Sequence, residues 1–247
     1  MGITYIGDSN GESVKPKAIY AGDSNNLSAL VKVAYVGNSS GKSVEVYRNS
    51  ALPYEYQKVE YIYNTNGTEY IDSGVKPNSD TRVEITFTRA STQALTLFGS
   101  YTSNSKYYRA LITNTSSPTS IRCEFGDGTN FTSDIAVNSK HTLLFNGSGG
   151  NFYLDGAFQF TSTKTFTALN YPMFIFGTSN QSGGAVPSST GIYIYHFAIK
   201  QGNTTIRDMY PCYLKADTQV VGMYDVANGA FYGNDGTGIF YKGPDVN

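Results

Sequence analysis

Tryptophan is absent from this sequence of 247 residues, and only two cysteines and two histidines are present. Two cysteines are too few for a disulfide framework, and Cys123 and Cys212 lack the spacing of metal ligands. They could meet across a sheet, but the sequence favours two small, buried and unpaired thiols. We therefore expect neither a disulfide scaffold nor a cysteine-based metal site.

Long apolar runs and strong charge are also missing. No apolar stretch approaches the ~20 residues that span a membrane, and the first residues lack the basic and apolar regions of a secretion signal. Charged residues make up 15% of the chain, the formal net charge is −1, and no basic stripe accompanies the aromatic residues. We therefore expect no membrane insertion and no nucleic-acid binding, because that binding depends on neutralising the phosphate backbone.

The residues in excess favour strands and tight turns. The chain holds 21 Tyr, 14 Phe and 26 Gly, together with many Ser, Thr and Asn residues. Tyr and Phe suit a pleated sheet, whereas Gly and Asn suit tight turns. No segment of useful length has a helical period. We therefore predict an all-β fold.

The first fifty residues repeat a fifteen-residue block three times, and each block opens with Tyr, any residue, Gly, Asp or Asn, and Ser. The aligned tyrosines and glycines are Tyr5, Tyr20, Tyr35, Gly7, Gly22 and Gly37. Because Asp, Asn and Gly favour turns between short β-prone runs, each block is predicted to form strand, turn and strand. Hairpins this small bury little surface, so residues 1–50 are predicted to be a docking or oligomerisation segment.

The first turn of the repeats also resembles part of a calcium-binding loop. Residues 8–10 give the D-x-N pattern of such loops. The remaining ligands and the glutamate at the twelfth position are missing, and turn chemistry explains the pattern. We expect no cofactor and no metal site, with calcium kept as the minor alternative.

Parts of residues 51–247 alternate apolar and polar side chains, as strands with one solvent-exposed face do. Residues 82–88 alternate apolar and polar side chains, and residues 140–160 contain three such strands. Asp155 and Gly156 form a strong hairpin signal between two of these strands. Strands at this spacing predict a two-sheet antiparallel sandwich.

Other runs predict which strands lie at the centre of the sandwich and where the end of the domain lies. Residues 171–177 and 191–200 are apolar on both faces, as buried central strands are. Residues 224–236 are predicted to form a last hairpin that lies beside residues 60–62 and 68–73. This pairing would bring the end of the domain back to its beginning.

Three runs of this domain resemble the laminin-G-like, concanavalin A-like jelly-roll family. They are KHTLLFN, NFYLDGAFQF and GIYIYHFAIKQGNTTIRDMYPC, which lie between residues 140 and 212. In that family a strand leads into a hairpin around an Asp-Gly turn, and another strand precedes the closing segment. Lys140 and His141 stand where the family often has Trp-His, which weakens any inherited ligand site. The resemblance implies a jelly-roll domain over residues 51–247.

Two further stretches, at residues 52–87 and 207–238, are similar to a variety of this domain found in phages and prophages. There the domain often follows short YIG- or YVG-type repeats, as it does here. The resemblance implies a virion structural protein, either a head fibre or capsid decoration protein or a tail or baseplate component. The implied partners are other virion proteins, which residues 1–50 would bind. We also expect a homo-oligomer, and a protein made in the bacterial cytoplasm without a signal peptide.

The catalytic motifs of jelly-roll hydrolases are not found. Such enzymes carry E-x-D-x-E or E-x-D-x-x-E on a strand, whereas Glu69 and Asp72 have the wrong spacing. His141 and His196 are not accompanied by a G-x-S-x-G nucleophile motif. We predict that the protein is not an enzyme, and that His196 is a hydrogen-bonded residue on a sheet face.

Carbohydrate binding is the function that the aromatic and loop residues suggest. Sugar sites pair an aromatic ring with nearby amide, carboxylate and hydroxyl groups. The candidate ligand-binding residues are Tyr107, Tyr108, Arg109, Asn130, Asn180 and Gln181. Their ordinary roles as loop polar groups and half-exposed sheet aromatics form the competing interpretation.

Two hypotheses therefore stand. In the first, the protein is a non-enzymatic virion component whose sandwich decorates or stabilises a particle, with glycan binding as an open second role. In the second, it is a dedicated receptor adhesin of a tail tip or bacterial surface that binds cell-surface or mucin glycans. Display in several copies would strengthen a weak sugar site through avidity.

Overall fold

The computed structural model describes residues 52–103, 106–113, 120–147, 150–164 and 168–246. In the repeat region it describes four strands, β1 (Tyr20–Gly22), β2 (Ser28–Leu30), β3 (Val33–Gly37) and β4 (Ser43–Arg48). The chain separates into two compact units, Met1–Ala51 and Leu52–Asn247. No helix in the described residues is long and apolar enough to cross a membrane.

The strands of the repeat unit form two antiparallel pairs, β1 with β2 and β3 with β4. Tyr20 and Gly22 belong to β1, and Tyr35 and Gly37 belong to β3. The turn predicted between the strands of each pair lies outside the described residues, so strand, turn and strand stays a prediction for these blocks. Tyr5, Gly7 and the calcium-like turn of the first block lie outside the described residues.

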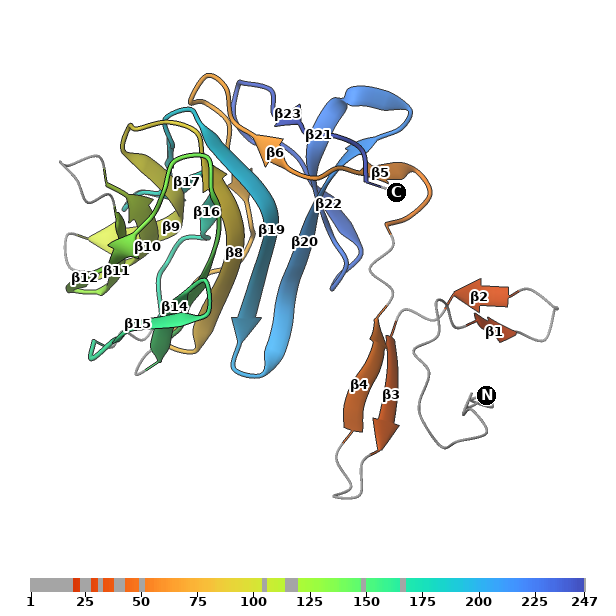
Figure 1. The fold of residues 1–247 in the computed structure, drawn as a ribbon, viewed down its shortest axis with the longest axis horizontal. Coiled ribbons are helices and arrows are strands. Elements are labelled where there is room, and N and C mark those ends of the chain that lie inside the picture. The colour runs from red at the N-terminus through yellow and green to blue at the C-terminus, as the bar shows by residue number, and fades with distance from the viewer. Residues whose placement is uncertain are drawn as a thin grey trace. The chain divides into compact units, whose positions relative to one another are not determined.

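The larger unit consists of two β-sheets (Figure 1). The smaller sheet has the strand order β12-β11-β10-β9-β16-β7, and β17 pairs with both β9 and β18. Its strands are β7 (Ile71–Asp72), β9 (Leu95–Ser103), β10 (Lys106–Ile112), β11 (Ser120–Gly126), β12 (Gly128–Asp134), β16 (Phe174–Ile175), β17 (Gly177–Ser179) and β18 (Ala185–Pro187).

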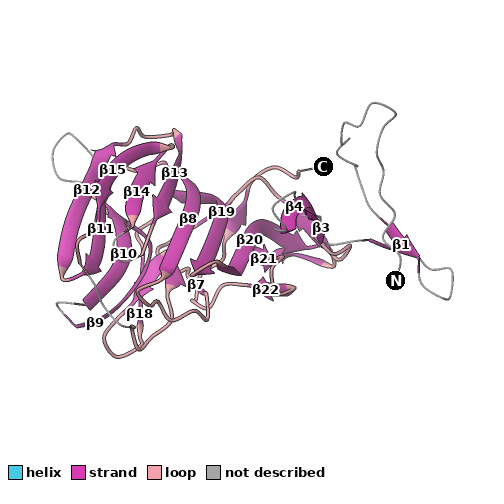
Figure 2. Ribbon diagram, turned by 90° about the horizontal axis from the view of Figure 1, so that it is seen from below, coloured by secondary structure: helices cyan, strands magenta, loops and turns pink. Residues whose placement is uncertain are grey.

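The larger sheet has the order β15-β14-β13-β8-β19-β20-β21-β22, and Figure 2 shows these strands side by side. Three short strands complete it, since β5 pairs with β20, and β6 pairs with β19 and β23. Its strands are β5 (Tyr56–Lys58), β6 (Ile62–Tyr63), β8 (Thr81–Arg89), β13 (Lys140–Phe145), β14 (Asn151–Leu154), β15 (Ala157–Thr161), β19 (Ile192–Gln201), β20 (Thr204–Leu214), β21 (Asp217–Asp225), β22 (Ala230–Tyr232) and β23 (Tyr241–Lys242).

The core lies between the two sheets and is rich in phenylalanine. Val83, Ile85 and Phe87 of β8 are fully buried, while Glu84 and Thr86 between them are more exposed. Phe98 of the smaller sheet packs edge-on against Phe145 and Phe197 of the larger sheet, at ring-centroid distances of 5.4 and 5.7 Å. These aromatic contacts join the sheets, and the predicted two-sheet jelly-roll sandwich is confirmed.

The local strand predictions are also confirmed. Residues 82–88 lie in β8, and residues 140–160 form β13, β14 and β15. Asp155 and Gly156 connect β14 to β15 with φ angles of 53° and 78°. A two-residue type I′ hairpin turn needs positive φ at both central positions, which Asp-Gly adopts readily.

The run at residues 171–177 is buried but does not form one strand. It divides into β16 and β17 at Phe176, whose φ is 61°. A bulky residue in this region costs about 1–3 kcal/mol, so the surrounding structure must hold it. Phe176 donates its N–H to the Leu97 carbonyl at 2.9 Å, accepts from the Ser188 N–H at 2.7 Å, and packs its ring on Phe240.

The run at residues 191–200 forms β19, which lies between β8 and β20 at the centre of the larger sheet. Ile194 and Phe197 are fully buried on its inner face. The outer face differs from the prediction, because Tyr193 and Tyr195 are only half-buried there. The predicted central position is therefore correct, and the predicted burial of both faces is wrong.

The C-terminal tail returns beside the first strands, as its pattern predicts. The Gly243 N–H bonds to the Tyr61 carbonyl at 2.8 Å, and the Asp235 N–H bonds to the Tyr70 carbonyl at 2.9 Å. The strand that pairs with β6 is β23, which lies beyond the predicted hairpin of residues 224–236. The end of the domain is thereby fixed to its beginning.

Both cysteines are free and buried, Cys123 in β11 of the smaller sheet and Cys212 in β20 of the larger sheet. The prediction of two buried, unpaired thiols is confirmed. Burial raises the pKa of both thiols, and that of Cys212 reaches about 12. Both side chains are therefore packing residues with little thiolate character.

We predict that neither thiol of the folded protein reacts with a reagent such as DTNB at about pH 8. With a pKa of about 12, roughly one Cys212 thiol in ten thousand is ionised at that pH, and the thiolate is the reactive form. Both thiols should react promptly once urea unfolds the chain. Rapid reaction of one equivalent in the native state would contradict the burial of both side chains.

Candidate functional site

The outer face of the smaller sheet carries a compact group of aromatic and charged side chains. In β10, Tyr108 points into the core while Tyr107 and Arg109 point outward, because successive side chains of a strand alternate. On the neighbouring strands, Tyr101 lies opposite Tyr107 and Glu124 lies opposite Arg109. The outer patch, as we call this group, comprises Tyr101, Tyr107, Arg109, Arg122 and Glu124.

The guanidinium of Arg109 lies against both rings of the outer patch. Its Cζ atom is 4.4 Å from the ring centroid of Tyr107 and 5.1 Å from that of Tyr101. The two ring centroids are 5.9 Å apart, and both tyrosines are half-buried. Cation–π attraction of this geometry orients the three side chains while leaving part of each ring in contact with solvent.

Gly99 makes room for this arrangement, because it lies opposite Arg109 in the register of β9 and β10. A Cβ atom on Gly99 would lie 2.2 Å from the Cβ of Arg109 and 3.0 Å from its Cα. Contacts this short require displacement of β10 or of the arginine. The absence of a side chain at this position therefore helps to place Arg109 over the rings.

A buried carboxylate links the two arginines of the outer patch. Glu124 is 5% exposed, and its Oε1 lies 2.9 Å from Nη2 of Arg122. Its Oε2 accepts a hydrogen bond from Nε of Arg109. A buried carboxylate is tolerated when it is paired and hydrogen-bonded, as this one is on both oxygens. Because two guanidiniums share one carboxylate, the group carries a net positive charge.

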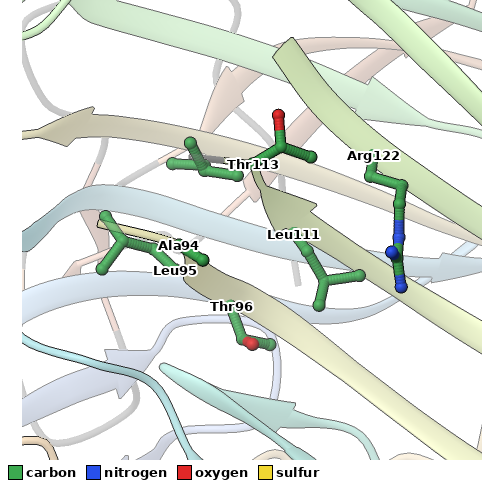
Figure 3. Close-up of a pocket in the computed structure, with 7 residues that line it drawn as sticks. Ala94, Leu95, Thr96, Leu111, Thr113 and Arg122 are labelled. Carbon is green, nitrogen blue, oxygen red and sulfur yellow. The ribbon is translucent and has the colours of Figure 1, made fainter. Parts of the chain in front are cut away.

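A hollow of about 220 Å³ adjoins the outer patch (Figure 3). Arg122, Leu111 and Thr96 line it from the adjacent strands β11, β10 and β9. The other lining residues are Ala94, Leu95, Ile112 and Thr113. The lining thus combines an aliphatic surface with threonine hydroxyls and one guanidinium.

Tyr108 differs from the prediction, because the structure places it in the core. Its side chain is fully buried, its ring packs against Phe145 at a centroid distance of 4.8 Å, and its hydroxyl donates to the Thr81 carbonyl at 2.9 Å. Burial raises the pKa of this phenol well above its ordinary value. A ligand on the sheet surface cannot reach Tyr108, so we remove it from the candidate site.

Asn130 is also separated from the outer patch. It lies opposite Cys123, whose side chain points into the core, so Asn130 is on the inner side of the sheet at its edge. Its neighbour Phe131 lies opposite Arg122 on the outer face and is 56% exposed. The structure therefore brings Phe131, and not Asn130, to the border of the patch.

Asn180 and Gln181 lie in the turn between β17 and β18. The Asn180 side chain accepts backbone hydrogen bonds from Ser182 and Gly184, both at 2.9 Å, which commits its carbonyl to the turn. Gln181 is exposed. Ser179, the residue before this turn, pairs with Ser100 of β9. The turn therefore lies beside β9, the strand that contains Tyr101. Asn180 has a structural role, and Gln181 is the more accessible of the two.

Arg122, Glu124 and Leu111 were not predicted from the sequence to be site residues. The alternation of β11 would place Arg122 and Glu124 on one face, which is a readable signal. The pairing of Glu124 with Arg109 depends on the register of β10 and β11, which the sequence does not reveal. The hollow depends on the same register, so it too could only be found in the structure.

A second aromatic surface lies on the outer face of the larger sheet. Tyr63 and Tyr193 stack at a ring-centroid distance of 4.9 Å, and Tyr61 meets Tyr193 edge-on at 5.0 Å. Tyr241 lies next to Tyr63 and is 55% exposed. This surface offers the same ring type as the outer patch on the opposite side of the sandwich.

Both histidines are paired with carboxylates. The Nε2 atom of His196 lies 2.8 Å from Oδ1 of Asp208, and Nδ1 of His141 lies 2.7 Å from Oδ2 of Asp155. The prediction that His196 is a hydrogen-bonded residue on a sheet face is confirmed. In the described part of the chain, no three His, Cys, Asp or Glu side chains are grouped so that they could hold a metal ion.

No family model matches the chain, and no curated protein matches its sequence. Solved structures are similar to it in fold. One is a Bacteroides ovatus protein whose proposed role is carbohydrate binding, with a TM-score of 0.51 and 11% identity over 83% of this chain and 68% of that chain. At this identity the likeness concerns the fold alone.

Two further solved structures match less of this chain. A heptameric SAP-like pentraxin from Limulus polyphemus has a TM-score of 0.42 and 10% identity, over 60% of this chain and 77% of that chain. A carbohydrate-binding module from Bacillus subtilis has a TM-score of 0.36 and 12% identity, over 59% of this chain and 95% of that chain.

We predict that Tyr108→Phe lowers the free energy of unfolding by about 1 kcal/mol, because the bond from its hydroxyl to the Thr81 carbonyl is lost. Tyr108→Ala should cost about 3–5 kcal/mol, as truncation of a large buried aromatic does. Urea denaturation of the full chain measures both changes. An alanine variant as stable as the wild type would contradict the placement of Tyr108 in the core.

Proposed function

We propose that this protein is a non-enzymatic virion component of a bacteriophage that displays a glycan-binding β-sandwich. We further propose that the sugar lies on the outer patch and in the adjoining hollow. The single observation that carries the glycan-binding role is the alignment of Tyr101, Tyr107 and Arg109 over the buried Glu124.

The chemistry of the outer patch suits a sugar. The C–H faces of a pyranose ring pack on aromatic rings, and its hydroxyls need donors and acceptors at fixed positions. Tyr101 and Tyr107 offer ring surface and phenolic hydroxyls, while Arg109 and Arg122 offer guanidinium donors. Because Glu124 holds both arginines, these donors are oriented before a ligand arrives, which lowers the entropic cost of binding.

The fold likeness supports the same proposal. The Bacteroides ovatus protein has carbohydrate binding as its own proposed role, and its fold is similar over most of this chain. A shared fold does not establish a shared ligand, since function depends on the site that a fold carries. The likeness therefore adds weight to the argument from the outer patch and does not replace it.

The virion part of the proposal rests on the sequence. Residues 52–87 and 207–238 resemble phage and prophage proteins, and the repeats in residues 1–50 have the form of an attachment segment. Several copies displayed on one particle would raise the apparent affinity of a weak sugar site. The partners in this account are other virion proteins, reached through residues 1–50, and cell-surface or mucin glycans.

The location on the particle separates the virion component from a dedicated receptor adhesin. Particles released by the host can be purified and labelled with gold-conjugated antibody against the sandwich. Label on the head fits a decoration protein or head fibre, whereas label on the tail tip or on the bacterial surface fits the adhesin. Purified particles that lack the protein would contradict the virion role.

We predict that Tyr107→Ala, and separately Tyr101→Ala, weakens binding of the multivalent full chain to host cells or mucin by about tenfold. Each change removes stacking surface and loosens Arg109, and a tenfold loss corresponds to about 1.4 kcal/mol. The measurement is a saturable binding curve with free sugars as competitors.

The matched control is Tyr193→Ala, which removes a half-buried tyrosine from the outer face of the larger sheet. It should leave sugar-competed binding unchanged. Loss of binding in Tyr193→Ala but not in Tyr107→Ala would move the site to the larger sheet. No sugar-competed binding by the wild type at any density would remove the glycan-binding role and leave a structural protein.

A further inference from the structure

We propose that the glycan bound at this site ends in an acidic sugar, whose carboxylate is held by Arg122 at the edge of the hollow. The inference rests on the proposed glycan-binding function and adds the chemical class of the ligand. It depends on three features of the described residues, which are the charge of the outer patch, the unused donors of Arg122 and the size of the hollow.

The charge of the outer patch favours an anion. Arg109 and Arg122 share the single carboxylate of Glu124, so one positive charge is not neutralised within this group. The carboxylate is enclosed, whereas the Arg122 side chain is 37% exposed, so the charge that meets solvent is positive. Asp134 is the acidic residue at the end of the neighbouring strand β12, and among the described residues it forms no ion pair with Arg122 that would neutralise this charge.

Arg122 has donors that the protein does not use. Its Nη2 binds Glu124 at 2.9 Å, and its Nε is enclosed without a hydrogen-bond partner. Within the described parts of the chain, Glu124 is the only residue that forms an ion pair or hydrogen bond with the Arg122 side chain. A planar guanidinium has five donors and matches a carboxylate with two parallel bonds. A ligand carboxylate would bind at the exposed end of the guanidinium, while the enclosed Nε stays out of its reach.

Arg109 is less suited to this role, although it belongs to the same patch. Its Nε is committed to Glu124, its guanidinium lies against Tyr101 and Tyr107, and its side chain is 15% exposed. It therefore contributes charge and orients the rings. Arg122 is the arginine that lines the hollow (Figure 3).

The hollow limits the size of the group that enters it. Its volume of about 220 Å³ is below the ~300–1,000 Å³ of sites that enclose a drug-sized ligand. One sugar unit at the end of a chain suits this space better than an internal stretch of oligosaccharide. Leu111 offers aliphatic contact for a ring face, and Thr96 offers a hydroxyl that makes no hydrogen bond with the described residues.

The test uses the full chain and pairs of sugars that differ in one acidic group. Titrations compare sialyllactose with its carboxylate methyl ester, methyl glucuronide with methyl glucoside, and galactose sulfate with galactose. The acidic carboxylate sugar should bind about tenfold more tightly than its neutral partner, which is the gain expected from one charge-assisted bonded pair. This preference should fall as salt is raised, because the pair is partly exposed.

Three variants locate the effect. Arg122→Gln should abolish the preference for the acidic sugar, while Glu124 stays paired with Arg109 and the fold is kept. Arg122→Lys retains the charge but not the planar fork, and should restore only part of the preference. Arg82→Gln changes an exposed arginine on β8 of the other sheet and should have no effect.

Equal binding of acidic and neutral sugars, together with loss of binding in Tyr107→Ala, would overturn this inference and leave the proposed function intact. Binding of the sulfated sugar but not of the carboxylate sugars would also overturn it, because the anion would then be a sulfate. If no sugar binds at all, both the inference and the glycan-binding function fail. A preference for carboxylate that survives in Arg122→Gln would contradict the assignment to Arg122.

Discussion

The organisation of this protein depends on the two-residue period of β10. Within this strand Tyr108 contributes to the core between the sheets, while its neighbours Tyr107 and Arg109 face the opposite way. A shift of one residue in the register would bury the arginine and expose the core tyrosine, so packing fixes the register strongly. The same constraint that stabilises the sandwich therefore also sets which side chains are available to a ligand.

Glu124 connects this constraint to the chemistry of the surface. A carboxylate that is 5% exposed requires partners on both oxygens, and Arg109 and Arg122 supply them. Glu124 in turn orients both arginines, because each of them is bonded to it. Gly99 completes the arrangement by leaving space for Arg109. The outer patch is therefore held in place by the packing and the ion pairs of the free protein, which is a condition for specific recognition.

The sequence predicts the local parts of this structure well and the long-range parts poorly. Alternation identifies β8, and the Asp155-Gly156 turn is readable because it needs only two adjacent residues with positive φ. Phe176 could not be foreseen, because contacts from distant segments hold its backbone. For the site, the stretch containing Tyr107 and Arg109 was identified, but not the face on which each residue lies. Asn130 was misplaced for the same reason, since its partner Cys123 is set by register.

The most direct test of this account is an NMR titration of the isotope-labelled full chain with the acidic sugar that binds best. The account predicts that the largest shift changes fall on β9, β10 and β11, at Tyr101, Tyr107 and Arg122, with little change at Tyr193. Changes centred on Tyr193 and the other tyrosines of the larger sheet would contradict it. Such a result would show that the outer patch is an ordinary part of the sheet surface.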